Sequence, residues 1–505
     1  MRELRSPQEA ATWLQGLGVQ RMVCDSRAVR AGDAFVAWPG AAHDGRRFVN
    51  AALRAGAAAC LVEKEGAELW NFVDPRVAVI QGLKAMTGPV AHALAGDPSA
   101  NLSVVAITGT NGKTSTAWWT AQWLGSAGLP SAVVGTLGMG RPGEALDATG
   151  MTTPDPARLA MALRDMHDDG VQAVVVEASS IGLEEARLAG THIHTAVFTN
   201  FTQDHLDYHG SMAAYWQAKR ALFDWPGLQA AVVNLDDPQG PGLAAELLPR
   251  AEAGALALWT VSAQGQEARL RVVQQRWTRQ GIAFTVAEGE DRAEFALPVV
   301  GDYNVSNLLC ALAVFRLRGL SLLQAMQASA GLSPVPGRMQ SAWPQAPADL
   351  PLVLVDYAHT PDALEKALLA LQPVAQERGG RLWCVVGCGG DRDRSKRPLM
   401  AAAAEREAAR LVLTSDNPRS EDPLSILHQM QAGLSEPVRA IVEPDRAQAI
   451  AEAVALCDSR DVVLLAGKGH EDYQDVAGEK RPFSDLVEAR KALQQRVPGH
   501  PGGAE

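Results

Sequence analysis

The sequence predicts an α/β protein of three domains, from its length and from the way its apolar runs end. A chain of 505 residues exceeds what one hydrophobic core usually holds. Short apolar runs alternate with helical stretches and stop in polar loops, as VQAVVVE does at Glu177. This alternation is typical of mostly parallel sheets, which bind ligands at the carboxyl ends of their strands. We expect domains over residues 1–92, 93–333 and 334–505, with the Pro/Gly-rich segment 331–337 at the second boundary.

The first domain is predicted to be a small α/β unit. A short strand is expected at Ala34–Ala37, where Pro-Gly stops it, and a helix and a strand follow within residues 43–63. The polar residues around Ser26 and His43 suit ordinary turns, and their chemistry alone assigns them no function.

The second domain opens with a strand that runs into a glycine-rich loop, VVAITGTNGKTS. Gly109 and Gly112 let backbone N–H groups point inward at phosphate, and a helix is expected from Lys113. Lys113 supplies a point charge and Thr114 a hydroxyl for Mg²⁺. A plain strand-to-helix turn is the alternative, which Gly-Lys-Thr disfavours. We therefore predict an ATP phosphate cradle formed by Gly109, Thr110, Asn111, Gly112, Lys113 and Thr114.

The rest of the second domain is predicted to extend its sheet. Apolar strands are expected within residues 194–200 and 230–237, and each ends in polar side chains. Alternating segments over 269–297 suggest an antiparallel extension, and helical runs at 301–319 and 321–329 close the domain.

Three side chains of this domain are candidate metal ligands. Glu177 ends a strand where a P-loop site needs a metal-holding carboxylate, although a solvated strand end is the alternative. His205 lies in the loop QDHLDYHG, and one loop histidine is weak support. Lys219 falls on the apolar face of the helical run MAAYWQAKRALF. It either snorkels to solvent or is a buried amine of depressed pKa, and a carbamate made with CO₂ would turn it into an oxygen ligand.

The third domain repeats the strand-to-polar-loop pattern at residues 352–362, 382–398, 409–423 and 461–474. One of these loops contains Asp-Asn-Pro-Arg, which as an ordinary turn would need no function. Arg419 nevertheless offers a planar fork for a carboxylate, and Asp416 could receive an ammonium. Arg392 and Glu471 end other strands and could add a second fork and a second acceptor. The set suits an amino acid with an extra carboxylate.

Composition limits the class of protein. The formal net charge of −11 argues against a nucleic-acid partner. The cysteines are spaced for neither a disulfide framework nor a zinc site, which favours a reducing compartment. The amino-terminal segment lacks the apolar core of a signal peptide, and no apolar run is long enough for a membrane span. We expect a cytoplasmic protein without membrane insertion.

A series of ordered motifs resembles one family. TGTNGKTS, TTPD, EASSIGL, TNFTQDHLDYHG, NVSN, VPGRMQ, DYAHTPDAL, GCGGDRDRSKRP, DNPR and GKGHEDYQ are similar, in that order, to motifs of the Mur ligases of peptidoglycan synthesis. The likeness covers essentially the whole chain, including DSRAVRAGDAFVA in the first domain. It implies a small amino-terminal α/β domain for the uridine nucleotide, a central P-loop ATPase-like domain and a Rossmann-like carboxyl-terminal domain for the amino acid.

The resemblance also implies an activity, that of an ADP-forming acid–amino-acid ligase of cell-wall biogenesis, and hence of cell shape and division. Such an enzyme would join meso-diaminopimelate to the D-glutamyl γ-carboxylate of UDP-N-acetylmuramoyl-L-Ala-D-Glu through an acyl phosphate. It would use ATP, two Mg²⁺ ions and a CO₂-derived carbamate on Lys219, and it would be a monomer.

Site residues follow from the motifs by position. The uridine-nucleotide substrate would contact Ser26, Thr152, Thr153, Ser179 and Arg187. ATP would contact the phosphate cradle and also Asn304, Arg338 and Asp356, with His359 nearby. Thr114 would hold one Mg²⁺, and Glu177, His205 and carbamylated Lys219 the other; these three and Lys113 would be catalytic. Diaminopimelate would contact Arg392, Asp416, Asn417, Arg419, Gly467 and Glu471.

Two residues depart from the family pattern, since Ile181 stands where histidine is frequent and Glu185 where glutamine is. The loop around His43 also differs from it. Three alternatives remain open. A lysine-adding ligase would have no second carboxylate for Arg419 to hold, and a folylpolyglutamate-type ligase would lack both the Asp-Ser-Arg type of first domain and Asp-Asn-Pro-Arg. The third alternative is a non-catalytic ATP-binding regulator.

Overall fold

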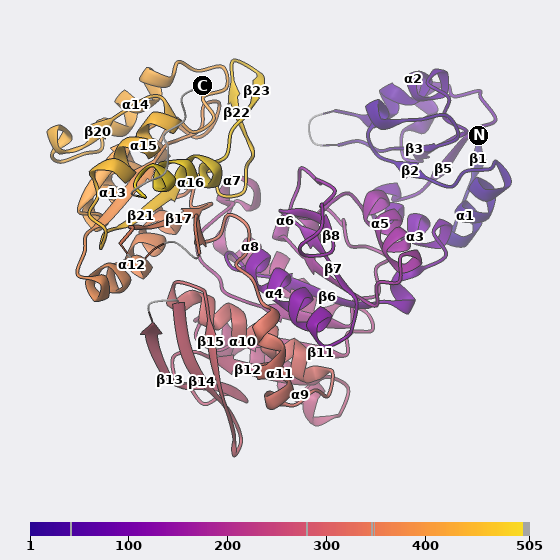
Figure 1. The fold of residues 1–505 in the computed structure, drawn as a ribbon. Coiled ribbons are helices and arrows are strands. Elements are labelled where there is room, and N and C mark those ends of the chain that lie inside the picture. The colour runs from indigo at the N-terminus through magenta and orange to yellow at the C-terminus, as the bar shows by residue number, and fades with distance from the viewer. Residues whose placement is uncertain (41–42, 279–280, 345–346, 348, 498–505) are drawn as a thin grey trace. The chain divides into compact units, whose positions relative to one another are not determined.

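The computed structural model describes residues 1–40, 43–278, 281–344, 347 and 349–497 (Figure 1). Their contacts divide the chain into two compact units. The first unit comprises Met1–Val273, Thr285–Glu294 and Val305–Leu332, and the second comprises Gln274–Phe284, Phe295–Asn304 and Ser333–Glu505. The boundaries predicted at residues 92 and 333 stay predictions. The predicted α/β class is confirmed in both units.

The amino-terminal part of the first unit contains a five-stranded parallel sheet in the order β1-β5-β4-β3-β2. Its strands are β1 (Arg2–Glu3), β2 (Met22–Val23), β3 (Ala34–Ala37), β4 (Ala59–Glu63) and β5 (Val77–Ile80). Its helices are α1 (Pro7–Gly16), α2 (Val49–Arg54) and α3 (Leu83–Leu94). The strand predicted at Ala34–Ala37 is β3, and every residue of it is buried.

A ten-stranded sheet follows, in the order β15-β14-β13-β12-β11-β10-β6-β9-β7-β8. Its strands are β6 (Ser103–Thr108), β7 (Ser131–Gly135), β8 (Gly138–Gly140), β9 (Ala173–Glu177), β10 (Thr195–Phe198), β11 (Ala230–Asn234), β12 (Ala257–Ser262), β13 (Leu270–Thr278), β14 (Gly281–Glu288) and β15 (Asp291–Leu297). The pairs from β7 to β12 are parallel, so the ends of β6, β9, β10 and β11 share one edge. The extension expected over 269–297 is the run β13 to β15, but its first strand, β13, joins the sheet parallel to β12 rather than antiparallel.

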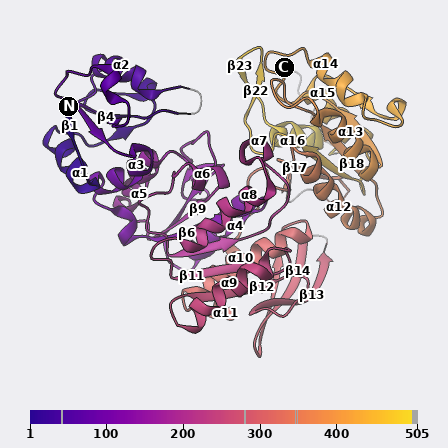
Figure 2. The same ribbon diagram turned by 180° about the vertical axis from the view of Figure 1, so that it is seen from behind.

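The helices of this part are α4 (Lys113–Ser126), α5 (Pro156–Asp168), α6 (Ser180–Glu184), α7 (Leu206–His209), α8 (Met212–Arg220), α9 (Gly240–Glu252), α10 (Asp302–Leu317) and α11 (Leu322–Ala328). Figure 2 gives the view from behind, where α9 lies by β11 and β12, against which it packs. Helix α4 packs on β6, β7 and β9, and its tryptophans are buried.

Helix α5 joins two hydrophobic cores of the first unit. Leu159 and Leu163 belong to the core of the ten-stranded sheet. Ala157 and Ala160, on another face of the same helix, belong to a core built mainly from residues of the amino-terminal sheet. Because one rigid helix serves both cores, the Thr-Thr-Pro-Asp segment before it is held between the two sheets.

The second unit contains a six-stranded sheet in the order β16-β17-β21-β18-β19-β20. Its strands are β16 (Gln340–Ser341), β17 (Leu352–Asp356), β18 (Leu382–Val386), β19 (Arg410–Leu413), β20 (Ile441–Val442) and β21 (Val462–Ala466). Only the β16–β17 pair is antiparallel among these described strands, so all four predicted strand-to-loop transitions share one edge. The hairpin β22 (Tyr473–Val476) and β23 (Glu479–Pro482) follows. The helices are α12 (Pro361–Arg378), α13 (Lys396–Glu407), α14 (Pro423–Gln431), α15 (Arg446–Leu456) and α16 (Asp485–Gln495).

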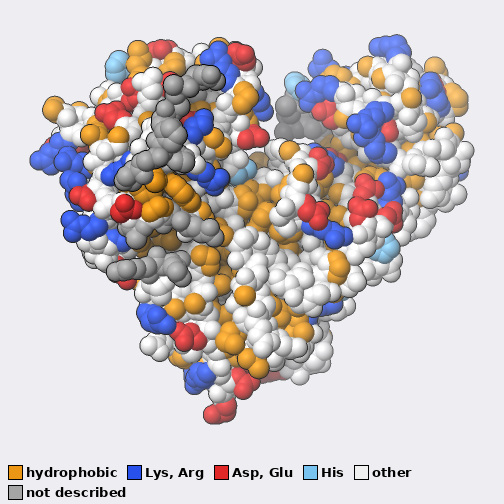
Figure 3. All heavy atoms as spheres, in the orientation of Figure 1, with side chains coloured by type: hydrophobic (Ala, Val, Ile, Leu, Met, Phe, Trp, Pro, Cys, Tyr) orange, Lys and Arg blue, Asp and Glu red, His pale blue; other side chains and the backbone are white. Residues whose placement is uncertain are grey.

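The surface carries charges of both signs. Figure 3 shows Lys and Arg side chains interspersed with Asp and Glu side chains on the face that it presents. Within the residues that the structure describes, none of the helices combines the length and the apolar character needed to cross a membrane.

Candidate active site

The glycine-rich loop between β6 and α4 is held in place by the segment that follows β10. The Thr110 N–H donates to Asn200 O (2.8 Å), and the Asn111 N–H donates to the Asn200 side chain (2.9 Å). Thr199 donates its hydroxyl to Asn111 O (2.6 Å), and Thr110 donates its own to Thr202 O (3.0 Å). The loop conformation is therefore set by side chains about ninety residues further along the chain.

Two glycines of this loop are required by close contacts. Gly109 has φ +150°, and a Cβ there would lie 1.9 Å from the Thr199 hydroxyl oxygen. Gly112 has φ +84°, and its Cβ would lie 2.2 Å from Asn307 Oδ1. Asn307, buried in α10, escaped the sequence analysis, which selected Asn304 instead. The signal was present, because Asn-Val-Ser-Asn places both amides one helical turn apart.

The side-chain nitrogens of two lysines meet at the Gly109 carbonyl oxygen. Lys113 Nζ lies 2.9 Å from it and also 2.9 Å from Thr110 O, whereas Lys219 Nζ lies 2.7 Å from Gly109 O. Lys219 is 1% exposed and lies over the Tyr215 ring. Burial, and after it the charge of Lys113, lower the pKa of Lys219 well below its usual value. The snorkelling alternative for Lys219 is wrong, because the amine does not reach solvent.

Glu177 is a buried carboxylate, 2% exposed, so the solvated-strand-end alternative is wrong. It accepts a hydrogen bond from the Thr114 hydroxyl (2.9 Å) and another from the Thr136 N–H (2.8 Å). Gly135 leaves room for it, since a Cβ there would lie 2.1 Å from Glu177 Oε1. Buried carboxylate and hydroxyl oxygens are the donors that Mg²⁺ prefers.

His205 is the N-cap residue just before α7 and has φ +50°, in the left-handed region, and its side chain is half-exposed. Its Nε2 lies 3.5 Å from the Asp204 carboxylate. Burial lowers the pKa of His205, an effect that Asp204 opposes. Among the described residues, no three His, Cys, Asp or Glu side chains are grouped closely enough to hold a metal.

The residues expected to contact the uridine-nucleotide substrate are partly brought together. Thr153 donates to Glu177 O (2.7 Å), and its hydroxyl lies 2.9 Å from that of Ser179. Arg187 donates to Thr153 O (3.0 Å), and the Thr152 and Thr136 hydroxyls are 3.1 Å apart.

Ser26 lies in a short 3₁₀ helix, Ser26–Ala28, capped by Asp25. The neighbouring Cys24 contacts Asp155, just after the Thr-Thr pair, and burial together with Asp155 raises the pKa of the Cys24 thiol. The contact therefore connects the turn that carries Ser26 with the segment that carries Thr152 and Thr153.

Glu185, one of the departures from the family pattern, has its own partners. Its carboxylate lies 2.7 Å from Lys84 Nζ of α3, and it accepts a hydrogen bond from the Tyr208 hydroxyl (2.6 Å). Burial raises the pKa of Glu185, but Lys84 and Tyr208 more than offset that effect. Ile181, the other departure, lies in α6 and is half-buried.

Asn304, Arg338 and Asp356 lie in the second unit, and the phosphate cradle lies in the first. The Asp356 carboxylate accepts from the N–H groups of Met339 (2.8 Å) and Ala358 (2.9 Å), and burial raises its pKa. The Arg338 guanidinium lies 4.8 Å from the centre of the Tyr357 ring. These three residues stay predicted ATP contacts, and His359, which was expected nearby, is exposed beside the Tyr357 ring.

A polar cluster gathers at the carboxyl edge of the six-stranded sheet. Asn417 donates to Glu471 Oε2 (2.8 Å) and accepts from Lys468 Nζ (3.0 Å). Gly467, with φ +114°, leaves space for Asp416, because a Cβ there would lie 2.6 Å from Asp416 Oδ2. Burial raises the pKa of Asp416, and Arg446 and Lys468 oppose it. Lys468 is a member of the cluster that the sequence analysis missed.

Arg419 and Arg392 flank one glycine of the same edge. A Cβ on Gly389 would lie 2.9 Å from an Arg419 terminal nitrogen and 3.6 Å from Arg392 Cγ. Arg419 has φ +51°, and its guanidinium donates to Gly390 O (2.6 Å). Its backbone is fixed by the β22 hairpin, since its N–H donates to Asp475 O (2.9 Å). A strained residue that is held this firmly is typical of binding sites.

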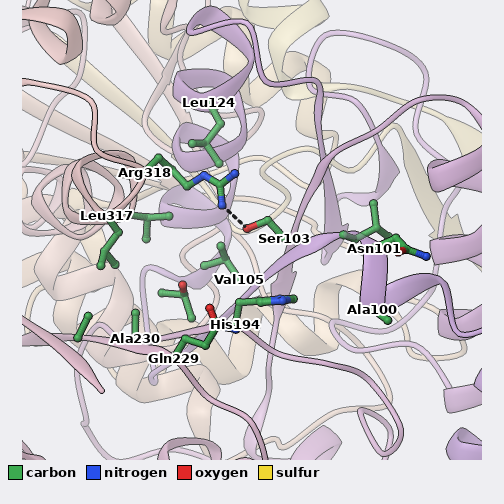
Figure 4. Close-up of a pocket in the computed structure, with 14 residues that line it drawn as sticks. Ala100, Asn101, Ser103, Val105, Leu124, His194, Gln229, Ala230, Leu317 and Arg318 are labelled. Atoms are coloured by element: carbon green, nitrogen blue, oxygen red, sulfur yellow. Dashed lines mark hydrogen bonds between the residues drawn. The ribbon is translucent and has the colours of Figure 1, made fainter. Parts of the chain in front are cut away.

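A cavity of about 410 Å³ lies at the opposite edge of the ten-stranded sheet (Figure 4). Ser103 and Ala230, near the starts of β6 and β11, line it with His194 and Gln229. Arg318 donates to Ser103 Oγ (3.1 Å) across it. The cavity is therefore separate from the phosphate cradle, which follows the other end of β6.

Three family models match the chain along its length. They are described as "Mur ligase family, catalytic domain" over residues 19–93, "Mur ligase middle domain" over 107–315, and "Mur ligase, glutamate ligase domain" over 337–469. A UDP-N-acetylmuramoyl-L-alanyl-D-glutamate–2,6-diaminopimelate ligase from Acidovorax sp. (strain JS42) is 56% identical over 500 residues, which cover 98% of each chain.

The chain belongs to the Mur ligase family.

Other relatives agree with this membership. A ligase of the same name from Ralstonia nicotianae is 47% identical over 94% of this chain and 93% of its own. Among solved structures, one of a UDP-N-acetylmuramoyl-L-alanyl-D-glutamate–2,6-diaminopimelate ligase is 34% identical, with a TM-score of 0.67, and covers 94% of this chain and 95% of its own. MurF from Acinetobacter baumannii is 17% identical (TM-score 0.62, covering 96% and 98%) and shares the fold. Enzymes of this family are ATP-dependent ligases, and the chain is therefore a ligase.

Gly112→Ala is expected to weaken ATP binding by about tenfold or more, because the new Cβ would collide with Asn307 and a positive φ disfavours alanine. Calorimetry with a non-hydrolysable ATP analogue and Mg²⁺ measures this. Gly143→Ala is the control, since Gly143 has φ +94° but open space around it. Equal affinities for the two variants would show that the contact with Asn307 does not set the loop.

Proposed function

We propose that this Mur ligase joins meso-diaminopimelate to the D-glutamyl γ-carboxylate of UDP-N-acetylmuramoyl-L-Ala-D-Glu. The observation that carries the proposal is the cluster at the edge of the second unit, where Asp416, Asn417 and Glu471 lie near Gly467 and two arginines flank Gly389. The names of relatives that match along nearly the full length support the same acceptor.

The acceptor site combines both charges that an amino acid presents. Asp416 and Glu471 are suited to ammonium groups, and the planar forks of Arg419 and Arg392 are suited to carboxylates. Meso-diaminopimelate carries two ammonium groups and two carboxylates, whereas lysine has a single carboxylate. A second guanidinium at this edge is explained by the diamino dicarboxylate and has no partner on lysine.

The reaction needs activation of a carboxylate, because oxide is a very poor leaving group. A γ-carboxylate oxygen of the D-glutamyl residue attacks the γ-phosphorus of ATP, which releases ADP and gives an acyl phosphate. The amine of diaminopimelate then attacks the acyl carbon, forms the amide, and expels inorganic phosphate while a proton is lost. Lys113 neutralises charge as the two anions approach one another, and the glycine loop positions the phosphates.

Two Mg²⁺ ions would supply further charge neutralisation. Thr114 would hold one through its hydroxyl oxygen, and Glu177 would hold the other through its buried carboxylate, with His205 offering an imidazole nitrogen. Lys219 as an ammonium would repel a cation. Its neutral amine can instead attack CO₂, so that an N–C bond forms and a proton leaves, giving an anionic carbamate. That product would be both an oxygen ligand and a partner for the Lys113 charge.

The proposal also includes a cellular location, an oligomeric state and a set of substrate contacts. A reaction that consumes ATP and a nucleotide sugar suits the cytoplasm. A monomeric state is a further part of the proposal. The ATP contacts of Asn304, Arg338 and Asp356 and the substrate contacts of Ser26, Thr152, Thr153, Ser179 and Arg187 are part of the proposal.

ADP release with each acceptor tests the function. Wild-type protein is expected to show a kcat/KM for meso-diaminopimelate about 100-fold above that for L-lysine, since one charged hydrogen-bonding pair is missing with lysine. Arg419→Lys should raise the KM for diaminopimelate by about tenfold. Arg410→Lys, at the exposed start of β19, is the control. Equal kcat/KM values for lysine and diaminopimelate would indicate the lysine-adding ligase. ADP release that does not increase with either acceptor would indicate a non-catalytic regulator.

Lys219→Ala is expected to lower kcat by about 100-fold or more, because the carbamate that completes the metal site is lost. A small carboxylic acid such as formate or propionate should restore part of the activity by supplying the missing oxygen atoms. The control variant Lys366→Ala, at an exposed position of α12, should keep wild-type activity, and added acid should not change it. Full activity of Lys219→Ala without added acid would contradict the carbamate.

A further inference from the structure

A buried ion pair lies beneath the acceptor cluster of the second unit. Arg446, the first residue of α15, is 1% exposed, and Asp485, the first residue of α16, is 0% exposed. Arg446 Nε lies 2.7 Å from Asp485 Oδ1, and a terminal nitrogen lies 2.6 Å from Oδ2. The pair is bidentate, which is the strongest geometry available to these groups.

The same guanidinium also reaches two backbone carbonyls. One terminal nitrogen donates to Ser415 O (3.3 Å), and the other donates to Ala466 O (3.0 Å). Ser415 directly precedes Asp416, and Ala466 directly precedes Gly467. Arg446 therefore binds the residue before each of two members of the acceptor cluster.

These two carbonyls belong to strand ends that the sheet does not join. Strand β19 and strand β21 each pair with β18, which lies between them. No ladder hydrogen bond therefore fixes the distance from Asp416 to Gly467. The two loops are joined instead by side chains, through the hydrogen bonds of Asn417 with Lys468 and Glu471. Gly387, after β18, allows a close approach, because a Cβ there would lie 2.8 Å from the Asp416 nitrogen. The rigid, planar guanidinium of Arg446 is hydrogen-bonded to the backbone on both sides, and so constrains the spacing of the two strand ends directly.

The position of Arg446 is unfavourable for the stability of the folded protein. A cation at the start of a helix opposes the helix dipole, and a buried ion pair often contributes little net stability compared with apolar residues. Asp485 by contrast is a favourable residue for a helix start. A functional requirement therefore explains the arginine at this position better than a contribution to folding stability does.

We propose that Arg446, oriented by Asp485, is a positioning residue that sets the spacing of Asp416 and Gly467 for the acceptor amino acid. Arg446 does not touch the acceptor; it acts through the two carbonyls. Its charge also opposes the burial that raises the pKa of Asp416, which helps to keep that carboxylate anionic for an ammonium group. The inference rests on the proposed acceptor site, because it concerns the residues that would bind the amino acid.

Steady-state kinetics of the full chain tests the proposal. Arg446→Lys keeps the charge but not the fork, and it is expected to raise the KM for diaminopimelate by about tenfold with the KM for ATP within about twofold. The double variant Arg446→Met/Asp485→Leu removes both buried charges together and so should fold. It should show the same selective rise in the KM for diaminopimelate, with a Tm close to that of the wild type.

Asp461→Asn is the matched control. Asp461 is also a buried carboxylate of this sheet, but it precedes β21 at the opposite edge and accepts from the Arg381 N–H (2.7 Å) and Trp383 Nε1 (2.9 Å). The Asp461→Asn substitution should lower the Tm but leave the KM for diaminopimelate unchanged, because Asp461 lies at the opposite end of the strands from Asp416.

The outcomes separate this inference from the proposed function. Arg446 variants that lose stability but keep the wild-type KM for diaminopimelate would overturn the positioning role. Failure of both Arg446 variants to fold, with Asp461→Asn folded, would also overturn it in favour of a purely structural pair. Absence of diaminopimelate-dependent ADP release from the wild-type protein would refute the proposed function itself, before any variant is compared.

Discussion

The contact of two lysines with the carbonyl oxygen of Gly109 is the interaction on which the chemistry of the first unit depends. Lys113 is the lysine proposed to contact phosphate, and the side-chain nitrogen of the buried Lys219 is hydrogen-bonded to the same carbonyl oxygen. Two like charges at such distances repel strongly when water is excluded. A neutral Lys219 relieves that repulsion, and an anionic derivative would convert it to attraction. The proposed carbamate on Lys219 would act in this way and would leave Lys113 as the cation.

Both units use the carboxyl edge of a parallel sheet, and both hold that edge with contacts from elsewhere in the chain. In the first unit the segment after β10 holds the glycine loop through Thr199 and Asn200. In the second unit buried guanidinium groups do so: Arg397 pairs with Glu421 (2.8 Å) and donates to Gly389 O (3.2 Å), beside Arg392 and Arg419. Loops that carry binding residues are flexible by default, so a binding edge needs such supports.

The sequence predicted the local features well, because they depend on short patterns. The strand that ends at Glu177, the helix that begins at Lys113 and the strand Ala34–Ala37 follow from apolar runs and glycines within a few residues. The ten-stranded order and the two units could not be predicted, because they depend on pairings between distant segments.

The same reason explains which site residues were missed. Asn307 is important only because Gly112, nearly two hundred residues earlier, lies against it. Lys468 and Arg446 resemble ordinary surface cations in the sequence, and only burial distinguishes them. For Glu185, the sequence showed a departure from the family pattern but not the compensating Lys84 and Tyr208, which come from other elements.

In the proposed reaction, the γ-carboxylate of the substrate is activated as an acyl phosphate. Transfer of ¹⁸O tests it most directly, with UDP-N-acetylmuramoyl-L-Ala-D-Glu labelled in the γ-carboxylate, unlabelled ATP and meso-diaminopimelate. If the γ-carboxylate oxygen bonds to the γ-phosphorus, the inorganic phosphate released should carry a single labelled oxygen for each amide formed. Amide formation with unlabelled phosphate would contradict the account.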